Sequence, residues 1–124
     1  MTTGRDQRGL SESVQHAVVF PVLMLITLGI IQTGIWIHAH NVAARSAAAA
    51  VDIARGSYGD TSEARETAVR LATSGGLDAV EVQVTRGGSE VRATVAGEAP
   101  LLIDFGLGRV SEFAAGPVEQ VSQP

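Results

Sequence analysis

The sequence predicts an α+β protein with a long N-terminal transmembrane helix, an alanine-rich continuation of that helix, a second short helix and a three-stranded antiparallel sheet. Three observations predict this order. No Asp, Glu, Lys or Arg lies between Ser13 and Ile37. Residues 38–55 are rich in alanine and contain neither Gly nor Pro. Further along, valines alternate with polar residues on both sides of Gly87-Gly88.

A membrane-spanning helix is expected over Ala17–Ile37, where Gln32 is the only strongly polar residue. At about 1.5 Å rise per residue, this segment covers a hydrocarbon core of about 30 Å. A cleaved secretory signal, with an Ala-x-Ala site in residues 47–50, is the alternative, but its apolar region normally has about 7–15 residues. Pro21 removes one backbone donor inside the span, so we expect a helix kink there.

The charges near the two ends of the span do not decide its orientation, because two arginines precede it and two follow it: Arg5, Arg8, Arg45 and Arg55. We favour a cytoplasmic N-terminus, because Asp52 dilutes the positive charge after the span and the folded part follows there. The expected organisation is a cytoplasmic leader (1–12), a transmembrane and extended helix (13–55) and a small extracytoplasmic head (56–124). The expected location is the cell membrane, crossed once.

Two short features inside or beside the span have more than one interpretation. Gly29 and Thr33 form a small-xxx-small pair, which either permits close helix approach or lies on an ordinary lipid-facing turn. Trp36, His38 and His40 follow at the end of the span, where amphipathic rings usually lie at headgroup level. Two histidines two positions apart point to different sides of a helix, whereas a helical metal pair needs a spacing of three or four. We therefore expect an interfacial anchor and no metal site.

The composition excludes several classes of function. The chain has no cysteine, and its nine basic residues are all arginine, so it offers neither a thiol nor a lysine as a nucleophile, and no serine lies in a nucleophile-elbow setting. The formal net charge of −4 with scattered arginines argues against nucleic acid as a partner. The sequence predicts no enzyme, no cofactor and no small-molecule substrate.

Beyond the span, alanines recur every three or four residues and form a narrow stripe suited to close packing against a sheet or another helix; they are Ala39, Ala43, Ala47, Ala50 and Ala54. Alternatively, alanine is present for its helix propensity alone. After a break at residues 56–60, Asp60 is expected to cap a second helix over Thr61–Thr73. Its predicted apolar face carries Ala64, Ala68 and Leu71, and Ser74-Gly75-Gly76 ends it.

The clearest strand pattern follows. Valines at every second position before and after Gly87-Gly88 predict a hairpin; they are Val80, Val82, Val84, Val91 and Val95. A two-stranded hairpin is marginal alone, so we expect a third strand over Val110–Ala115, with Phe113 on one face. The alanine stripe is expected to cover the valines.

The connection at residues 99–107 is unusually apolar for a loop. It contains Leu101, Leu102, Ile103, Phe105 and Leu107. We expect it to cover the open end of the sheet; contact with a membrane or with a neighbouring subunit is the alternative.

Several motifs taken in order resemble a known family. Arg8-Gly9 precedes a polar stretch and Gln15, an apolar run with an early proline follows, and residues 41–56 read NVAARSAAAAVDIARG. This arrangement resembles the TadE-like pseudopilins, minor subunits of the tight-adherence (Flp, type IV-like) pilus system. The C-terminal part, from Val91–Val95 to Gly116-Pro117-Val118-Glu119, is similar to the ending of actinobacterial members. The resemblance implies a pilin-like fold.

The resemblance also implies a processing site. A prepilin peptidase would cut after Gly9 on the cytoplasmic side, so that Leu10 begins the mature chain and the membrane helix stays intact. The chain departs from the family at Gln15, where the family has a glutamate; Glu12 stands three residues earlier. In type IV assembly that glutamate is thought to pair with a neighbour's new N-terminal amine, because an unpaired carboxylate in an apolar filament core is costly. Either Glu12 substitutes for it, or this subunit does not follow ordinary filament packing.

The expected function is that of a membrane-anchored TadE-like minor pilin in the assembly or surface display of a Flp/Tad-type pilus. Its partners would be the lipid bilayer, other pilin-like subunits, the Tad assembly machinery and a prepilin peptidase. The alternative is a single-pass envelope protein whose outer domain binds a secretion or envelope partner without entering a filament.

Overall fold

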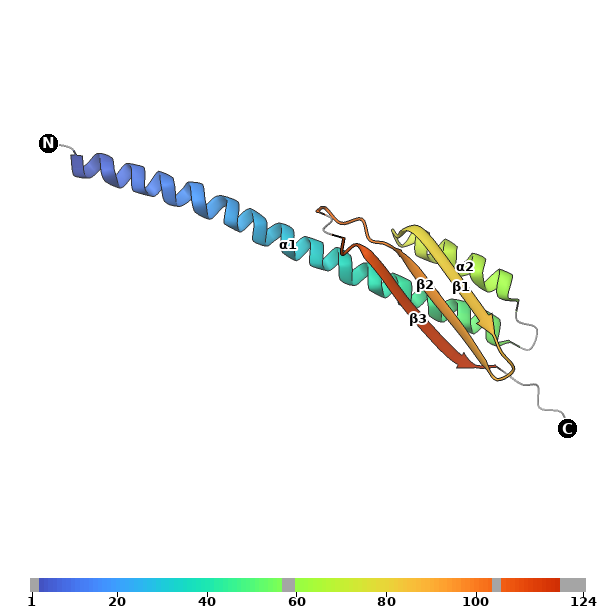
Figure 1. Ribbon diagram of the computed structural model, residues 1–124. Coiled ribbons are helices and arrows are strands. Elements are labelled where there is room, and N and C mark those ends of the chain that lie inside the picture. Colours follow the sequence, from blue (N-terminus) through green and yellow to red (C-terminus); the bar gives the residue numbers. More distant parts are fainter. Residues whose placement is uncertain (1–2, 57–59, 104–105, 119–124) are drawn as a thin grey trace. The chain divides into compact units, whose positions relative to one another are not determined.

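The computed structural model describes residues 3–56, 60–103 and 106–118, with side chains from residue 11 onward. The elements are α1 (Thr3–Arg55), α2 (Thr61–Ser74), β1 (Asp78–Arg86), β2 (Glu90–Glu98) and β3 (Arg109–Pro117) (Figure 1). The predicted α+β order is confirmed. The chain divides into two units, Met1–Thr33 and Gly34–Pro124, and α1 contributes residues to both. The second unit is called the head below.

α1 begins at Thr3, ten residues before the start near Ser13 that the sequence predicted. Polar residues do not prevent this, because extending an existing helix costs far less than nucleating one. The helix continues through Pro21 without interruption. The kink expected there stays a prediction.

α2 begins as predicted, because the Asp60 side chain accepts a hydrogen bond of 2.8 Å from the backbone N–H of Ser62. Its apolar face differs from the prediction in one residue. Ala64, Ala68 and Ala72 are fully buried, whereas Leu71 is 45% exposed. Positions 64, 68 and 72 lie along one line of the helix surface, so the buried face of α2 consists of alanine methyl groups in the core cluster.

The three strands form an antiparallel sheet in the order β1-β2-β3, so the hairpin and the third strand are confirmed. Val82 lies opposite Val95 on the neighbouring strand, and Thr94 lies opposite Phe113. A bulge interrupts the start of β1, next to Ala79 with its positive φ of 49°. The valines of β1 and β2 face inward, whereas Phe113 lies on the opposite face and is 67% exposed.

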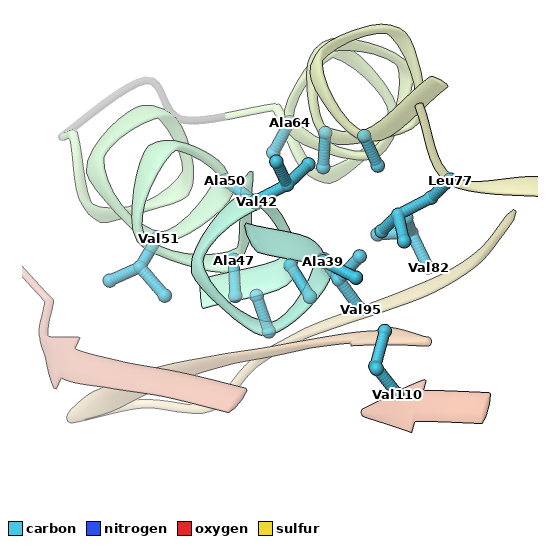
Figure 2. Packing of buried hydrophobic residues seen from close by; sticks show 14 of the residues in the cluster. Ala39, Val42, Ala47, Ala50, Val51, Ala64, Leu77, Val82, Val95 and Val110 are labelled. Atoms are coloured by element: carbon cyan, nitrogen blue, oxygen red, sulfur yellow. The ribbon is translucent and has the colours of Figure 1, made fainter. Parts of the chain in front are cut away.

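Both helices cover the inward face of this sheet. Figure 2 shows alanines and valines of α1 between the sheet and α2. All five alanines of the predicted stripe are at most 2% exposed, which confirms that the stripe packs. Among the described residues, the largest side chains with less than 2% exposure are Val91, Val95 and Val110. This core therefore gains its stability from close backbone approach and not from large side chains.

Two glycines permit that approach. A Cβ atom at Gly75, the C-cap of α2, would lie 2.8 Å from Cγ2 of Val42. A Cβ atom at Gly116 in β3 would lie 2.9 Å from Cδ of Arg55 and 3.1 Å from Cγ1 of Val51. The distances of 2.8 and 2.9 Å are shorter than real Cβ atoms show, so α2 and β3 approach α1 at places where they have no side chain.

The prediction that the apolar connection covers the core is wrong for most of its described residues. Leu101 does pack against the core, but Leu102, Ile103 and Leu107 are 57%, 43% and 68% exposed. Buried Leu77 and Ala99 already close this end of the core. The N–H of Ala99 also donates to the carbonyl of Gly108 at 2.7 Å, which joins the two ends of the connection and leaves the residues between them outside. Phe105 lies outside the described residues.

Candidate functional site

The most apolar part of α1 has no partner in the structure. Among the described residues, one helix, Ser11–Arg55, is long and apolar enough to cross a membrane, and none of its most apolar stretch is buried. The exposed side chains there are large: Phe20, Leu25 and Ile30 are 66%, 63% and 68% exposed. A helix that is apolar on all sides requires an apolar environment, so this part of α1 fits a single-pass membrane helix.

The polar side chains of this segment suit such an environment. The hydroxyl of Thr27 donates to the carbonyl of Leu23 at 2.9 Å, and that of Thr33 donates to the carbonyl of Gly29 at 2.7 Å. Both hydroxyls are thus satisfied inside the helix, as hydrocarbon demands. Gly29 has open space beside it, since a Cβ atom there would meet nothing within 4 Å.

The residues predicted to act in processing and assembly all lie in the first part of α1. The backbone of Gly9 and Leu10 is helical. Glu12 and Gln15 are exposed, and their spacing of three places them near each other on the helix surface. The Nδ1–H group of His16 donates to the backbone carbonyl of Glu12 at 2.8 Å.

At the start of the head, the two histidines that were expected to anchor the chain at the headgroups contact protein groups. The Nδ1–H group of His40 donates to Oε1 of Glu112 at 2.7 Å, and the ring of His40 meets Trp36 edge-on, with ring centroids 4.3 Å apart. Nε2 of His38 lies 3.3 Å from the carbonyl of Gly75. The two rings point to different elements, as predicted, and their anchor role stays a prediction.

Sequence reasoning missed Glu112. The period-two pattern of β3 places it on the same face as buried Val110, and an acidic residue on a covered face needs a hydrogen-bond partner. An acidic residue at an inward-facing position of the strand therefore indicated a polar contact there. His40 is 72 residues away in the sequence, so nothing local identified it as the partner.

A second contact fixes the opposite end of β3. Nε of Arg55 donates to the carbonyl of Pro117 at 2.9 Å, close to Gly116, which lies against α1. Together with the His40–Glu112 contact, this holds β3 along α1 at both ends. Within the head, β3 is therefore fastened to α1 by two polar contacts around an apolar core.

The described residues offer little for chemistry. No group of three or more His, Asp or Glu side chains among them could hold a metal ion. A hollow on the outer surface of α2 is lined by Arg65, Glu66 and Arg70 with Ser62, Val69, Thr73 and Ser74, and these side chains form a solvated helix face. The exposed apolar surface of α1, which is suited to packing against lipid or other helices, is therefore the functional candidate.

The comparison with protein families finds a likeness along this helix. The family model described as TadE-like protein matches residues 11–52. Residues 11–52 form a TadE-like segment. It contains Glu12, Gln15, the whole apolar run and most of the alanine stripe, and it ends before α2. No curated protein and no solved structure matches the chain.

The likeness is to the family described as TadE-like protein, and residues 53–124 lie outside it. The match does not reach the C-terminal residues that resemble actinobacterial members, so that affiliation stays a prediction.

Proposed function

We propose that the protein is a membrane-anchored TadE-like minor pilin that acts in the assembly or surface display of a Flp/Tad-type pilus. The observation that carries the proposal is the TadE-like segment at residues 11–52, in which one helix has two different halves. The first half exposes large apolar side chains, and the second half buries small ones against α2 and the sheet. The protein acts through packing and has no catalytic role.

The mechanism follows from the two halves. The apolar half of α1 holds the subunit in the bilayer, with the N-terminus in the cytoplasm and the head outside the cytoplasm. A prepilin peptidase cuts after Gly9, so that Leu10 becomes the first residue and its new amine becomes available. The same apolar half then packs against the helices of other pilin-like subunits, and the Tad assembly machinery moves the subunit.

Gln15 supports a second candidate. A glutamine forms hydrogen bonds but supplies no charge to pair with a neighbour's amine, and it occupies the place of the family's glutamate. The second candidate is thus a single-pass envelope protein whose head binds a secretion or envelope partner without entering a filament.

The intact mass of the membrane-extracted protein distinguishes these functions at the first step. A prepilin-peptidase substrate starts at Leu10, a plain anchor starts at Met1 or Thr2, and a product of signal cleavage starts after about Ala50. A Gly9→Ala variant should keep its leader. Unchanged maturation of that variant would show that the cut does not depend on Gly9 and would refute recognition of Gly9 by a prepilin peptidase.

The second step asks whether the processed chain enters filaments. Cells that lack the gene should lose surface pili, and the wild-type gene should restore them. Cleavage at Gly9 with normal piliation in the deletion strain would separate processing from pilus assembly and favour the second candidate.

A further inference from the structure

The exposed apolar residues of the head are concentrated at one end. Seven large apolar side chains of the described part of the head are exposed: Trp36, Ile37, Leu71, Leu102, Ile103, Leu107 and Phe113. Phe113 lies in the middle of β3, opposite Thr94. The other six lie close to the end where the chain enters the head at Gly34, as the following contacts show. We call this the span-side end.

Contacts within the head establish this placement. The His40–Glu112 and Arg55–Pro117 hydrogen bonds show that β3 runs in the same direction as α1. From Glu112 back to Arg109 the strand covers about 10 Å, and from His40 back to Gly34 the helix covers about 9 Å. Arg109 is therefore level with Gly34, and the connection before it, with Leu102, Ile103 and Leu107, lies at the span-side end.

α2 also ends in this part of the head, beside residues 38–42 of α1. Its C-cap Gly75 lies against Val42 and within 3.3 Å of His38 through its carbonyl, and Leu71 lies one turn earlier. The opposite end of the head carries the Gly87–Ser89 turn and the end of β3, where no described large apolar side chain is exposed. The asymmetry is thus a property of the folded head.

We propose that the residues Leu102, Ile103 and Leu107, together with Trp36 and Ile37, form a lipid-contacting patch that rests in the bilayer interface beside the exit of α1. The argument is chain continuity: the apolar run Ala17–Ile37 extends into the start of the head at Gly34, so the span-side end is the part of the head nearest to the bilayer. Amphipathic rings such as Trp36 favour the headgroup region, and exposed leucines gain free energy when they leave water. This inference rests on the membrane anchoring in the proposed function.

The patch gives the head a second membrane contact. A single helix permits a head to rotate and tilt above the bilayer, whereas a second contact on one side of that helix restricts both motions. The head would then present the same face, the outer surface of the sheet with Phe113, to neighbouring subunits. Release of the patch from lipid would accompany any extraction of the subunit from the membrane.

Depth-dependent fluorescence quenching tests the proposal. The chain has no cysteine, so single-cysteine variants of the full-length protein can carry one environment-sensitive dye each. Leu107→Cys and Leu102→Cys report on the patch, Ser89→Cys on the opposite end of the head, and Leu25→Cys on the span. The proteins are placed in phosphatidylcholine–phosphatidylglycerol vesicles that contain lipids with a nitroxide near the headgroup.

Dyes at positions 107 and 102 should show blue-shifted emission, several-fold stronger quenching by the nitroxide lipid than the dye at position 89, and weaker quenching by aqueous iodide. Equal iodide quenching at positions 107 and 89, with the dye at 25 protected, would overturn the patch and leave the anchor intact. An unprotected dye at 25 would refute the anchor and the patch together. Energy transfer between dyes at 107 that disappears on dilution with lipid would show that a second copy covers the residues, which would also overturn the proposal.

Discussion

Gly75 lies so close to Val42 that a Cβ atom at Gly75 would approach Cγ2 of Val42 to 2.8 Å. The φ angle of −79° at Gly75 is accessible to any residue, so it is the neighbouring helix and not the backbone conformation that requires glycine here. The contact joins α2 to α1 next to the carbonyl that His38 approaches.

Replacement of Gly75 by alanine should therefore destabilise the head. Overpacking of this kind costs about 1–3 kcal/mol, measured as the change in the free energy of unfolding of the full chain in detergent. Gly88→Ala is the matched control, because a Cβ atom there meets nothing within 4 Å. The Gly75→Ala, Val42→Ala double variant should recover part of the loss, and equal stability of the single variant and the wild type would contradict the contact.

A larger side chain at Ala47, in the alanine stripe, should destabilise the head more than the same change at its neighbour Ala48. Ala47 is fully buried and Ala48 is exposed, so Ala47→Leu should lower the free energy of unfolding by about 1–3 kcal/mol or more, while Ala48→Leu should change it by less than about 0.5 kcal/mol. Thermal unfolding followed by circular dichroism gives both values. Similar effects at the two positions would mean that the stripe does not face the sheet.

The His40–Glu112 hydrogen bond should contribute measurably to stability. Both side chains are only about one third exposed or less, at 28% and 36%, and the bond is short, so its loss in Glu112→Ala should cost about 1 kcal/mol. A double-mutant cycle with His40→Ala isolates the pair from the effects of each truncation.

The control for this cycle is the Glu90–Arg92 pair, whose side chains are 53% and 62% exposed. Its coupling should be close to zero, since water competes for both groups. A coupling at His40–Glu112 no larger than that value would refute a stabilising role for the bond.

A carboxylate at position 15 should increase incorporation into filaments if the proposed function holds. Gln15→Glu supplies the charge that pairs with a neighbour's amine, so the fraction of the protein in sheared pili should rise, as measured by immunoblot. Ser13→Glu adds the same charge two positions away, on another side of the helix, and should not raise it. If Glu12 already serves as the partner, Glu12→Gln should abolish incorporation, and Gln15→Glu should restore it in that background. No change in any of these variants would contradict a role for charge pairing.

The elements of the fold were predictable because each has a periodic signature. The alternating valines around Gly87-Gly88 indicate a hairpin, and Ala39, Ala43 and Ala47 repeat with the period of a helix face. The start of α1 was not predictable, because the polar residues before Ser13 neither favour nor stop a helix that is already formed.

Which side chains are buried depended on how closely the elements pack in the folded chain, and the periodicity of the sequence does not give that distance. Hydrophobicity favoured Leu71 for the buried face of α2, but the approach of α1 selected Ala72. Likewise, apolar residues were expected to cover the core, and Leu102 and Leu107 instead point away from it, since Leu77 and Ala99 already close that end. The His40–Glu112 contact joins distant parts of the chain, and only the acidic residue on an inward face hinted at it.

The small side chains of the core also limit how the sequence can evolve. An alanine held between two backbones can be replaced by a larger residue only with a clash, and by glycine only with a loss of about 1 kcal/mol in helix propensity. Both kinds of substitution are therefore unfavourable at Ala43, Ala47 and Ala50, whereas the exposed positions between them tolerate substitution. Among related sequences, the alanines should persist at every third or fourth position long after the outer surface of the head has diverged.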